Sequence, residues 1–242
     1  MAGGNSKGRS STPSETNDGS SFVTKWLGRA VVLCLFFATC SWLDSIKHRW
    51  YVFTPEFLHE LAQEAVASAP APDDTYYMIN HIVSNLTATY PSDVVALNHD
   101  TKEWMFNNAG GAMGAMYIIH ASITEYLIIF GTPLGTEGHS GIHTADDYFN
   151  ILVGEQWAFD PPNLEKEVYP PGSVHHLRRG HMKQYKMHEG CFALEYARGW
   201  IPLMLPFGLA DVLTSTLDYK SFYRTAVITG REMFRNLAIF KI

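Results

Sequence analysis

The residues from about Trp104 to Leu205 form a series of short β-prone segments separated by Gly- and Pro-rich turns. The segments read AMYIIHAS, EYLIIFGT, YFNILVGEQWAF, SVHHLRR, KQYKMH and CFALEYA. Short strands at such spacing are typical of antiparallel sandwiches and barrels. This part of the chain is therefore predicted to form a small barrel or jelly roll.

An apolar run lies closer to the N-terminus. Residues 26–43 read WLGRAVVLCLFFATCSWL, and Arg29 is the only charge within them. A helix of this length just spans a hydrocarbon core if Arg29 reaches the interface. A cleaved signal peptide is the alternative, but the run ends in bulky Trp42 and Leu43 rather than in small residues. We expect one transmembrane helix, whose orientation the flanking charges leave open.

Helical signals flank the predicted strands. Thr54 followed by Pro55 is typical of a helix start, and a second helix is predicted from about Asp73 to Thr89. In the last forty residues one helix face is basic, with Lys220, Arg224, Arg231 and Arg235. The opposite face holds Phe222, Ala226, Met233 and Leu237. This pattern favours a helix in a membrane interface, and a docked helix with a solvated basic face is the alternative.

The predicted organisation has five parts. They are a disordered Gly/Ser/Thr-rich tail (residues 1–22), the transmembrane helix (23–45), a helical segment (46–103), the β-rich domain with its pocket (104–202) and C-terminal amphipathic helices (203–242). The net charge of −6 argues against nucleic acid as a partner. The three cysteines make no disulfide framework.

Glu195 is the most informative polar residue. The stretch from Cys191 to Ala210 carries only two charges, Glu195 and Arg198, and a carboxylate is costly to bury in such a run unless it has a use or a partner. In a strand, Glu195 shares a face with small residues, which leaves space for a ligand. The sequence predicts a carboxyl group with a raised pKa in an apolar cavity. A buried salt bridge to Arg198 is the alternative.

Three long strings carry a family resemblance. They are GTPLGTEGHSGIHTADDYFNILVGEQ, YPPGSVHHLRRG and YKMHEGCFALEYARGWIPLMLPFGLADVLTSTLD. They resemble the fungal C-8 sterol isomerases and, more distantly, the sigma non-opioid receptor. The similarity runs from about Tyr51 to the C-terminus. The resemblance implies an α+β fold with an N-terminal transmembrane helix, a cupin-like β-barrel or jelly roll around a hydrophobic pocket, and two C-terminal helices at the membrane interface.

The resemblance also implies a reaction. The isomerase moves a sterol double bond from the 8 to the 7 position through a C8 carbocation, in ergosterol-type biosynthesis. This chemistry needs a neutral acid, a base and negative charge near the cation, but no cofactor. The alternative is a non-enzymatic receptor that binds cationic amines or sterols. A sterol substrate, amine inhibitors that mimic the cation, membrane lipid and a homotrimer are the implied partners, and a single-pass protein of the endoplasmic reticulum membrane is the implied location.

The predicted catalytic residues are Glu195, which matches the family's pocket glutamate, and Asp146 and Asp147. Neighbours in a strand face opposite ways, so only one aspartate should look inward, and we favour Asp146. A turn or helix cap is the alternative role for both aspartates. The predicted substrate-binding residues are Tyr126, Ile128, Phe130, Ser140, His143, Tyr185, Met187, Ile201 and Leu205. Tyr126 is also a candidate hydrogen-bond partner of Glu195.

Several histidines allow a metal site to be considered, because cupin-like barrels often hold iron, manganese or zinc. However, no His-x-His pair with a downstream glutamate is present. Adjacent His175 and His176 would face opposite ways in a strand. We therefore expect no metal site.

Overall fold

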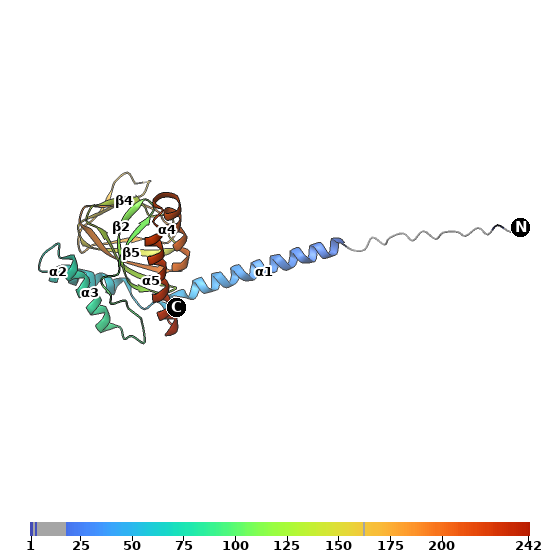
Figure 1. Cartoon of the computed structure of the whole chain (residues 1–242), viewed down its shortest axis with the longest axis horizontal. Coiled ribbons are helices and arrows are strands. Elements are labelled where there is room, and N and C mark those ends of the chain that lie inside the picture. The colour runs from blue at the N-terminus through green and yellow to red at the C-terminus, as the bar shows by residue number, and fades with distance from the viewer. Residues whose placement is uncertain (2, 4–17, 162) are drawn as a thin grey trace. The chain divides into compact units, whose positions relative to one another are not determined.

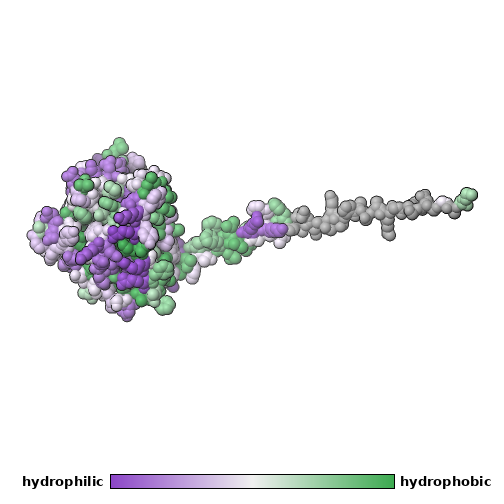
Figure 2. All heavy atoms as spheres, in the orientation of Figure 1, coloured by the Kyte–Doolittle hydropathy of each residue, from purple (hydrophilic) through white to green (hydrophobic). Residues whose placement is uncertain are grey.

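The computed structural model describes residues 1, 3, 18–161 and 163–242, so most of the predicted disordered tail lies outside the described residues. The chain divides into two units, residues 1–46 and 47–242. The first unit contains one helix, α1 (Asp18–Ile46). The continuous helical stretch Phe22–Trp50, which includes most of α1, is long and apolar enough to cross a membrane. Figure 2 shows hydrophobic residues along much of α1.

The second unit holds the remaining helices and all described strands (Figure 1). Its helices are η1 (Lys47–Trp50), α2 (Pro55–Ser68), α3 (Thr75–Thr89), η2 (Ile201–Leu203), α4 (Leu205–Asp211), the π-helical turn η3 (Val212–Thr216) and α5 (Tyr219–Ala238). Its strands are β1 (Trp104–Ala109), β2 (Ala112–Ala121), β3 (Glu125–Thr132), β4 (Thr136–His139), β5 (Ala145–Val153), β6 (Gln156–Phe159), β7 (Glu167–Tyr169), β8 (Val174–Leu177), β9 (Gln184–Met187) and β10 (Cys191–Gly199).

The strands form two antiparallel sheets. The six-stranded sheet has the order β1-β2-β3-β10-β5-β8, and the four-stranded sheet has the order β4-β9-β6-β7. The α+β class and the jelly-roll-like arrangement agree with the sequence prediction. Among the described residues the two sheets remain separate and form no closed barrel.

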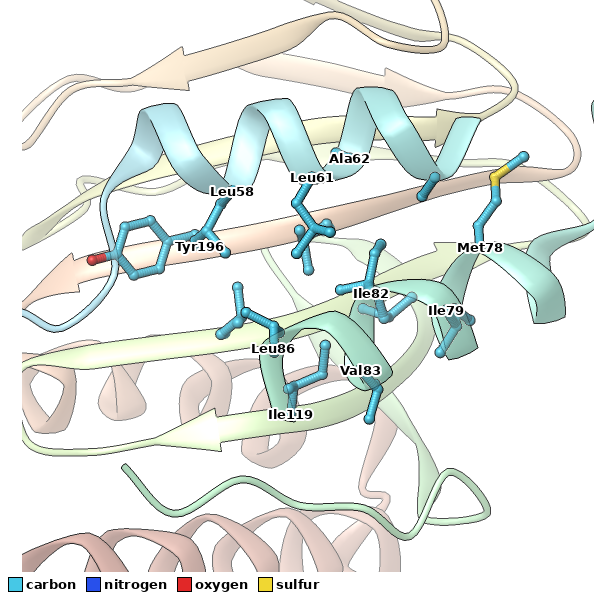
Figure 3. Packing of buried hydrophobic residues seen from close by; sticks show 14 of the residues in the cluster. Leu58, Leu61, Ala62, Met78, Ile79, Ile82, Val83, Leu86, Ile119 and Tyr196 are labelled. Carbon is cyan, nitrogen blue, oxygen red and sulfur yellow. The ribbon is translucent and has the colours of Figure 1, made fainter. Parts of the chain in front are cut away.

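The six-stranded sheet is buried on both faces. Helices α2 and α3 cover one face, where their apolar residues pack against alternate residues of the strands, including Ile119 and Tyr196 (Figure 3). Thr54 caps α2 by accepting a hydrogen bond from the Phe57 N–H (3.3 Å), and Pro55 begins the helix, as predicted. The opposite face of the sheet carries a second cluster that includes Met116, Phe149 and Ala193. Glu195 lies on this second face because it is two residues from Ala193.

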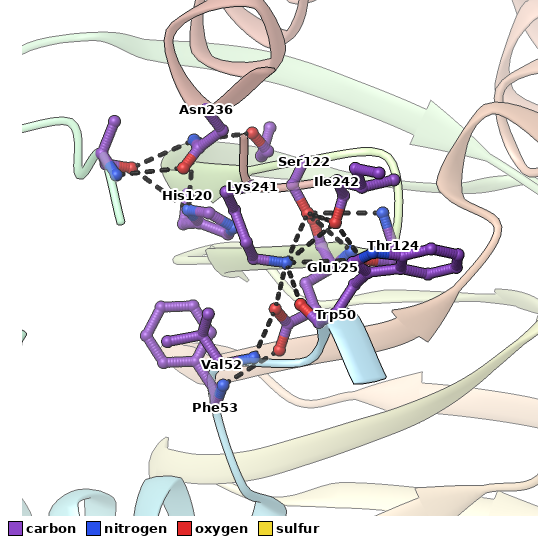
Figure 4. Close-up of polar contacts among 12 residues, drawn as sticks. Trp50, Val52, Phe53, His120, Ser122, Thr124, Glu125, Asn236, Lys241 and Ile242 are labelled. Atoms are coloured by element: carbon purple, nitrogen blue, oxygen red, sulfur yellow. Dashed lines mark hydrogen bonds and ion pairs between the residues drawn. The ribbon is translucent and has the colours of Figure 1, made fainter. Parts of the chain in front are cut away.

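A buried ion pair fastens the C-terminus to the sheet. The Lys241 Nζ lies 2.7 Å from the Glu125 Oε2, and both side chains are almost fully buried (Figure 4). The Glu125 carboxylate also accepts hydrogen bonds from the N–H groups of Val52 (2.9 Å) and Phe53 (3.0 Å). The first and last segments of this unit are thereby joined at one end of β3.

The C-terminal helix α5 has an unusual distribution of residues. Its buried face is largely polar and includes Thr229, Glu232 and Asn236. Its exposed large apolar residues are Tyr219, Tyr223, Val227, Phe234 and Leu237. Of the predicted apolar face, Phe222 and Met233 are partly buried, and Ala226 and Leu237 are exposed.

The predicted basic face of α5 also has internal partners. Arg231 contacts Glu103 (2.6 Å) and Glu232 (2.7 Å), and Arg235 contacts Glu232 (2.8 Å). These ion pairs satisfy the buried Glu232 carboxylate, whose burial would otherwise be costly. Through the Arg231–Glu103 pair, the face also fixes the helix to the residue that precedes β1.

Candidate functional site

A cavity of about 470 Å³ lies on the inner face of the six-stranded sheet. Residues of both sheets and of α4, η3 and α5 line it, and Glu195 is part of its wall. The volume falls within the range of about 300–1,000 Å³ that is common for small-molecule sites. Glu195 is partly buried. Protein surrounds its side chain except on the side that faces the cavity.

Strand pairing brings a second acid to Glu195. Glu195 of β10 lies opposite Phe149 of β5, and Ala197 lies opposite Asp147. Glu195 and Asp147 are thus diagonal neighbours on one face of the sheet, within reach of each other's side chains. Asp147 is fully buried behind the cavity wall, and its carboxyl interacts with that of Glu195. Two carboxylates that are close together repel each other, which favours a proton on one of them.

Burial shapes the titration of both acids. Loss of solvation raises the pKa of Glu195 to about 7, although its interaction with Asp147 acts in the opposite direction. Loss of solvation, followed by repulsion from Glu195, raises the pKa of Asp147 well above its ordinary value. The two groups titrate as a coupled pair. Near neutral pH the pair therefore keeps at least one proton, as the apolar run around Glu195 suggests.

The preference for Asp146 as the inward-facing acid is wrong. Asp146 faces away from the cavity, and its Oδ1 contacts the His176 Nε2 (3.3 Å) and the Arg179 N–H (3.1 Å). The next residue, Asp147, points inward because neighbouring strand residues alternate. Only one of the two aspartates faces inward, as predicted, but that residue is Asp147 rather than Asp146.

The alternative role for Glu195, a salt bridge to Arg198, is also excluded by the strand. Arg198 donates a hydrogen bond to the Tyr148 hydroxyl (2.9 Å) and lies over the Tyr148 ring. Residues three apart on β10 face opposite sides, so Arg198 is on the outer face. The ionisable group that interacts with Glu195 is therefore an acid, Asp147, and not the basic Arg198.

Most predicted substrate-binding residues line the cavity. These are Tyr126, Ile128, Phe130, Ser140, His143, Tyr185, Ile201 and Leu205. Met187 is absent from the cavity wall and packs fully buried in the adjacent apolar cluster. It shares a strand face with Tyr185, but it is fully buried. The prediction for Met187 as a wall residue is therefore wrong.

Tyr126 does not bond Glu195. Its hydroxyl hydrogen-bonds the Thr229 hydroxyl of α5 (3.1 Å) and contacts the Met116 sulfur (3.9 Å). Burial raises the pKa of Tyr126 well above its ordinary value. Tyr126 therefore links the cavity wall to α5 and stays neutral.

His143 joins the acid pair to the cavity wall. Its Nδ1 lies 3.5 Å from the Asp147 Oδ2, and its ring lines the cavity. Burial lowers the pKa of His143, so the imidazole is neutral at neutral pH. Two acids and the neutral His143 imidazole thus lie together beside apolar walls, an arrangement suited to moving a proton on a hydrophobic ligand.

Several wall residues have no local sequence pattern that would predict them. Phe207 of α4 packs close to Gly110 and Gly141, where a side chain would collide with the ring. Both glycines have positive φ angles, 64° and 72°, which favour glycine. Gln156 and His175 also line the cavity, from different sheets. Such contacts arise only when both sheets are assembled.

In the described part of the chain, no three His, Cys, Asp or Glu side chains are grouped closely enough to hold a metal ion. His175 is buried and His176 is exposed to the outer face, in line with the expected alternation along β8. The sequence expectation that metal is not required stays a prediction.

This geometry defines a protein with a largely apolar cavity next to a pair of interacting carboxyl groups. The family model described as "ERG2 and Sigma1 receptor like protein" matches residues 30–241. The chain therefore belongs to the family of ERG2 and Sigma1 receptor like proteins. The resemblance in the sequence is thus confirmed.

Relatives of two kinds are similar to this chain. The C-8 sterol isomerase erg2 of Aspergillus fumigatus is 60% identical over 89% of this chain and 88% of its own length. The C-8 sterol isomerase of Pyricularia oryzae is 62% identical over 79% and 85%, respectively. The sigma non-opioid intracellular receptor 1 of Danio rerio is 33% identical over 81% and 85%.

Solved structures with similarity to this chain include KdgF from Halomonas sp., with a TM-score of 0.35 and 12% identity over 42% of this chain and 92% of that chain. A cupin superfamily protein from Desulfitobacterium hafniense has a TM-score of 0.31 and 13% identity over 45% and 87%.

Proposed function

We propose that this protein is a C-8 sterol isomerase that moves a ring double bond from the 8 to the 7 position. The observation that carries the proposal is Glu195, a carboxyl with a raised pKa in the wall of an apolar cavity and next to a buried acid, Asp147. The identity to curated C-8 sterol isomerases, 60% and 62%, supports the same activity.

In the proposed reaction, neutral Glu195 transfers its proton to C9, using the π electrons of the C8=C9 bond. Positive charge then develops at C8, next to the Glu195 carboxylate. The C7–H bond breaks, its electron pair forms the C7=C8 bond, and its proton goes to the Glu195 carboxylate. The acid is restored, and no cofactor is consumed. A low-dielectric cavity strengthens the attraction between the carboxylate and the cation.

Asp147 has a positioning role in this scheme, because it is buried behind Glu195 rather than in the cavity wall. Its interaction with Glu195 stabilises the Glu195 carboxylate and so offsets part of the desolvation that raises the Glu195 pKa. The pKa of Glu195 near 7 suits a group that must both give and take a proton at neutral pH.

The experiment is sterol conversion by membranes that contain the protein, in a host that lacks this activity. The wild type should convert a Δ8-sterol into the Δ7-sterol. In D₂O the product should gain deuterium at C9, and product without deuterium at C9 would contradict the proton route. Glu195→Gln should bind sterol but form no product.

The second candidate is a receptor without catalytic activity, favoured by the 33% identity to a sigma receptor. Sterol binding by the wild type with no conversion would support it over the isomerase. The higher identity to the fungal isomerases favours the enzyme.

The same site should bind protonated tertiary amines, because their charge mimics the C8 cation next to the Glu195 carboxylate. Such amines should compete with the sterol, and their affinity should fall in Glu195→Gln. Equal affinity for the wild type and the variant would contradict a contact between the amine and Glu195.

We also propose that α5 lies on a membrane surface. Its exposed apolar residues, including Tyr223, Val227 and Phe234, are opposite its buried polar face. An environment-sensitive dye on a cysteine at position 234, with Cys34 and Cys40 replaced, should show apolar emission in vesicles. The same dye at exposed Glu60 of α2 should report water, and similar emission at both positions would contradict the proposal.

The endoplasmic reticulum is the proposed location, supported by α1 as a candidate membrane anchor and by the sterol isomerase relatives. Fluorescence microscopy of the tagged chain tests it. The homotrimer stays a prediction, which chemical crosslinking in membranes would test.

A further inference from the structure

The cavity has a second polar region, formed by Gln156 of β6 and His175 of β8. These strands belong to different sheets, and a hydrogen bond of 2.8 Å between the His175 Nδ1 and the Gln156 Oε1 joins them. Both side chains are almost fully buried, with 0% and 2% of their surface exposed. Both residues line the same cavity as Glu195.

Each residue of this pair keeps one unused polar atom. The Nε2 of Gln156 and the Nε2 of His175 are shielded from solvent and have no hydrogen-bond partner among the described residues. With the Nδ1–H donating to the Gln156 Oε1, the pair is left with an amide donor and an imidazole acceptor. The reversed amide and tautomer would also leave one donor and one acceptor. Buried polar groups without partners are rare in native proteins and call for an explanation.

The His175 ring is held firmly in a neutral form. It stacks between Tyr169, at a centroid distance of 4.6 Å, and Phe149, at 6.0 Å. Burial lowers the His175 pKa to about 4. The nearby charge of Lys183 is paired with Glu167, 2.7 Å from its Oε1. The unused atoms are therefore a fixed, uncharged donor and acceptor, which matches a hydroxyl group better than an ion.

The strand register sets the spacing between this pair and the acid. Glu195 lies opposite Phe149, and Phe149 lies opposite His175, so the three residues form one row across β10, β5 and β8. Two strand spacings separate the backbones of Glu195 and His175 by about 10 Å. A sterol carries its hydroxyl on ring A and its Δ8 double bond at the junction of rings B and C. This span leaves room for the rings plus one hydrogen bond of about 3 Å.

We propose that Gln156 and His175 form the binding subsite for the ring-A hydroxyl of the sterol. The hydroxyl donates to the His175 Nε2, and its oxygen accepts from the Gln156 amide. The inference rests on the proposed function, because that function supplies the sterol. The subsite fixes which ring faces Glu195, and it thereby makes the hydroxyl a requirement for productive binding.

The test compares a Δ8-sterol with its 3-deoxy analogue on the full-length protein in membranes. The wild type should prefer the alcohol by about 100-fold in kcat/KM, because the analogue leaves both buried atoms without partners. In the double variant Gln156→Leu/His175→Phe this preference should fall to about threefold or less. The ratio of the two substrates is independent of how much variant protein is folded.

Met187→Leu is the matched control, because Met187 lies opposite Gln156 in the strand pair, is buried, and is outside the cavity wall. It should keep the wild-type preference. The subsite is ruled out if the wild type converts the deoxy analogue as well as the alcohol, or if the double variant keeps the wild-type preference. A wild type that converts neither sterol would instead contradict the proposed function, and the ratio of the two dissociation constants would then test the subsite.

Discussion

Two glutamates on neighbouring strands, Glu125 buried and Glu195 partly buried, have opposite environments. Glu125 begins β3, where a lysine, two backbone N–H groups and the Tyr196 hydroxyl (2.6 Å) all donate to its carboxylate. Glu195 lies next to Tyr196 on β10 but faces the other side of the sheet, where its partner is a second acid. Glu125 is thus a satisfied anion that stabilises the fold. Glu195 is a carboxyl group whose proton is available for the proposed transfer to the ligand.

The comparison shows that burial alone does not mark a functional carboxyl. The number and kind of donors around it are decisive. Donors and cations around a carboxylate favour its ionised form, which has no proton to give. The same change, from glutamate to glutamine, should therefore have different consequences at the two positions.

Glu195→Gln should have the largest effect on activity. The amide cannot donate a proton to C9 or accept one from C7, so we expect kcat/KM to fall by at least about 1,000-fold. The measurement is sterol conversion normalised to folded protein. Activity within about tenfold of the wild type would assign the proton transfer to another group.

Glu125→Gln should instead affect stability. Removing the negative charge leaves Lys241 buried without its counterion, which should lower the free energy of unfolding by about 3–5 kcal/mol. Denaturant unfolding in detergent measures the loss. The folded fraction should keep its kcat/KM, and a selective loss of catalysis with unchanged stability would reverse the roles given to the two glutamates.

Stability should also depend on pH through Glu195. Its folded pKa, about 7, is above its ordinary value of 4.5, so the folded state holds the proton more tightly. This contribution is fully present below the ordinary value and is lost as the pH rises through about 7, on the order of 3 kcal/mol. Glu195→Gln should flatten this dependence. Equal pH dependence in the wild type and the variant would contradict the raised pKa.

Asp147→Asn should have the smallest effect of the four. The asparagine amide can still donate to the Glu195 carboxylate, so we expect kcat/KM to fall by about tenfold. Asp146→Asn is the matched control on the outer face, and its kcat/KM should change by less than about twofold. A larger loss in Asp146→Asn than in Asp147→Asn would overturn the assignment of the inward-facing acid.

Local sequence patterns explain why Glu195 could be predicted. One acid in an apolar run, with small residues on its strand face, indicates a cavity. Alternation also showed that Asp146 and Asp147 must face opposite ways. Choosing between them needed the register of β5 against β10, which depends on pairing between residues far apart in the sequence.

Long-range contacts also explain what the sequence did not reveal. Glu125 and Lys241 lie more than a hundred residues apart, and no local pattern joins them. The Gln156–His175 pair connects two sheets, so the sequence pattern of neither strand predicts the contact. The polar buried face of α5 follows from its partners rather than from helix periodicity: Glu232 pairs with Arg231 and Arg235 of α5 itself, and Asn236 donates to the carbonyls of Ala96 and Ala121.

The protonation state of Glu195 is the most direct test of the account. Infrared difference spectroscopy of the wild type and Glu195→Gln can follow the carboxyl band of this residue during a pH titration. A protonated carboxyl that ionises with an apparent pKa of about 7 is the expected result. A carboxylate that remains ionised throughout the neutral range, with an ordinary pKa near 4.5, would contradict it.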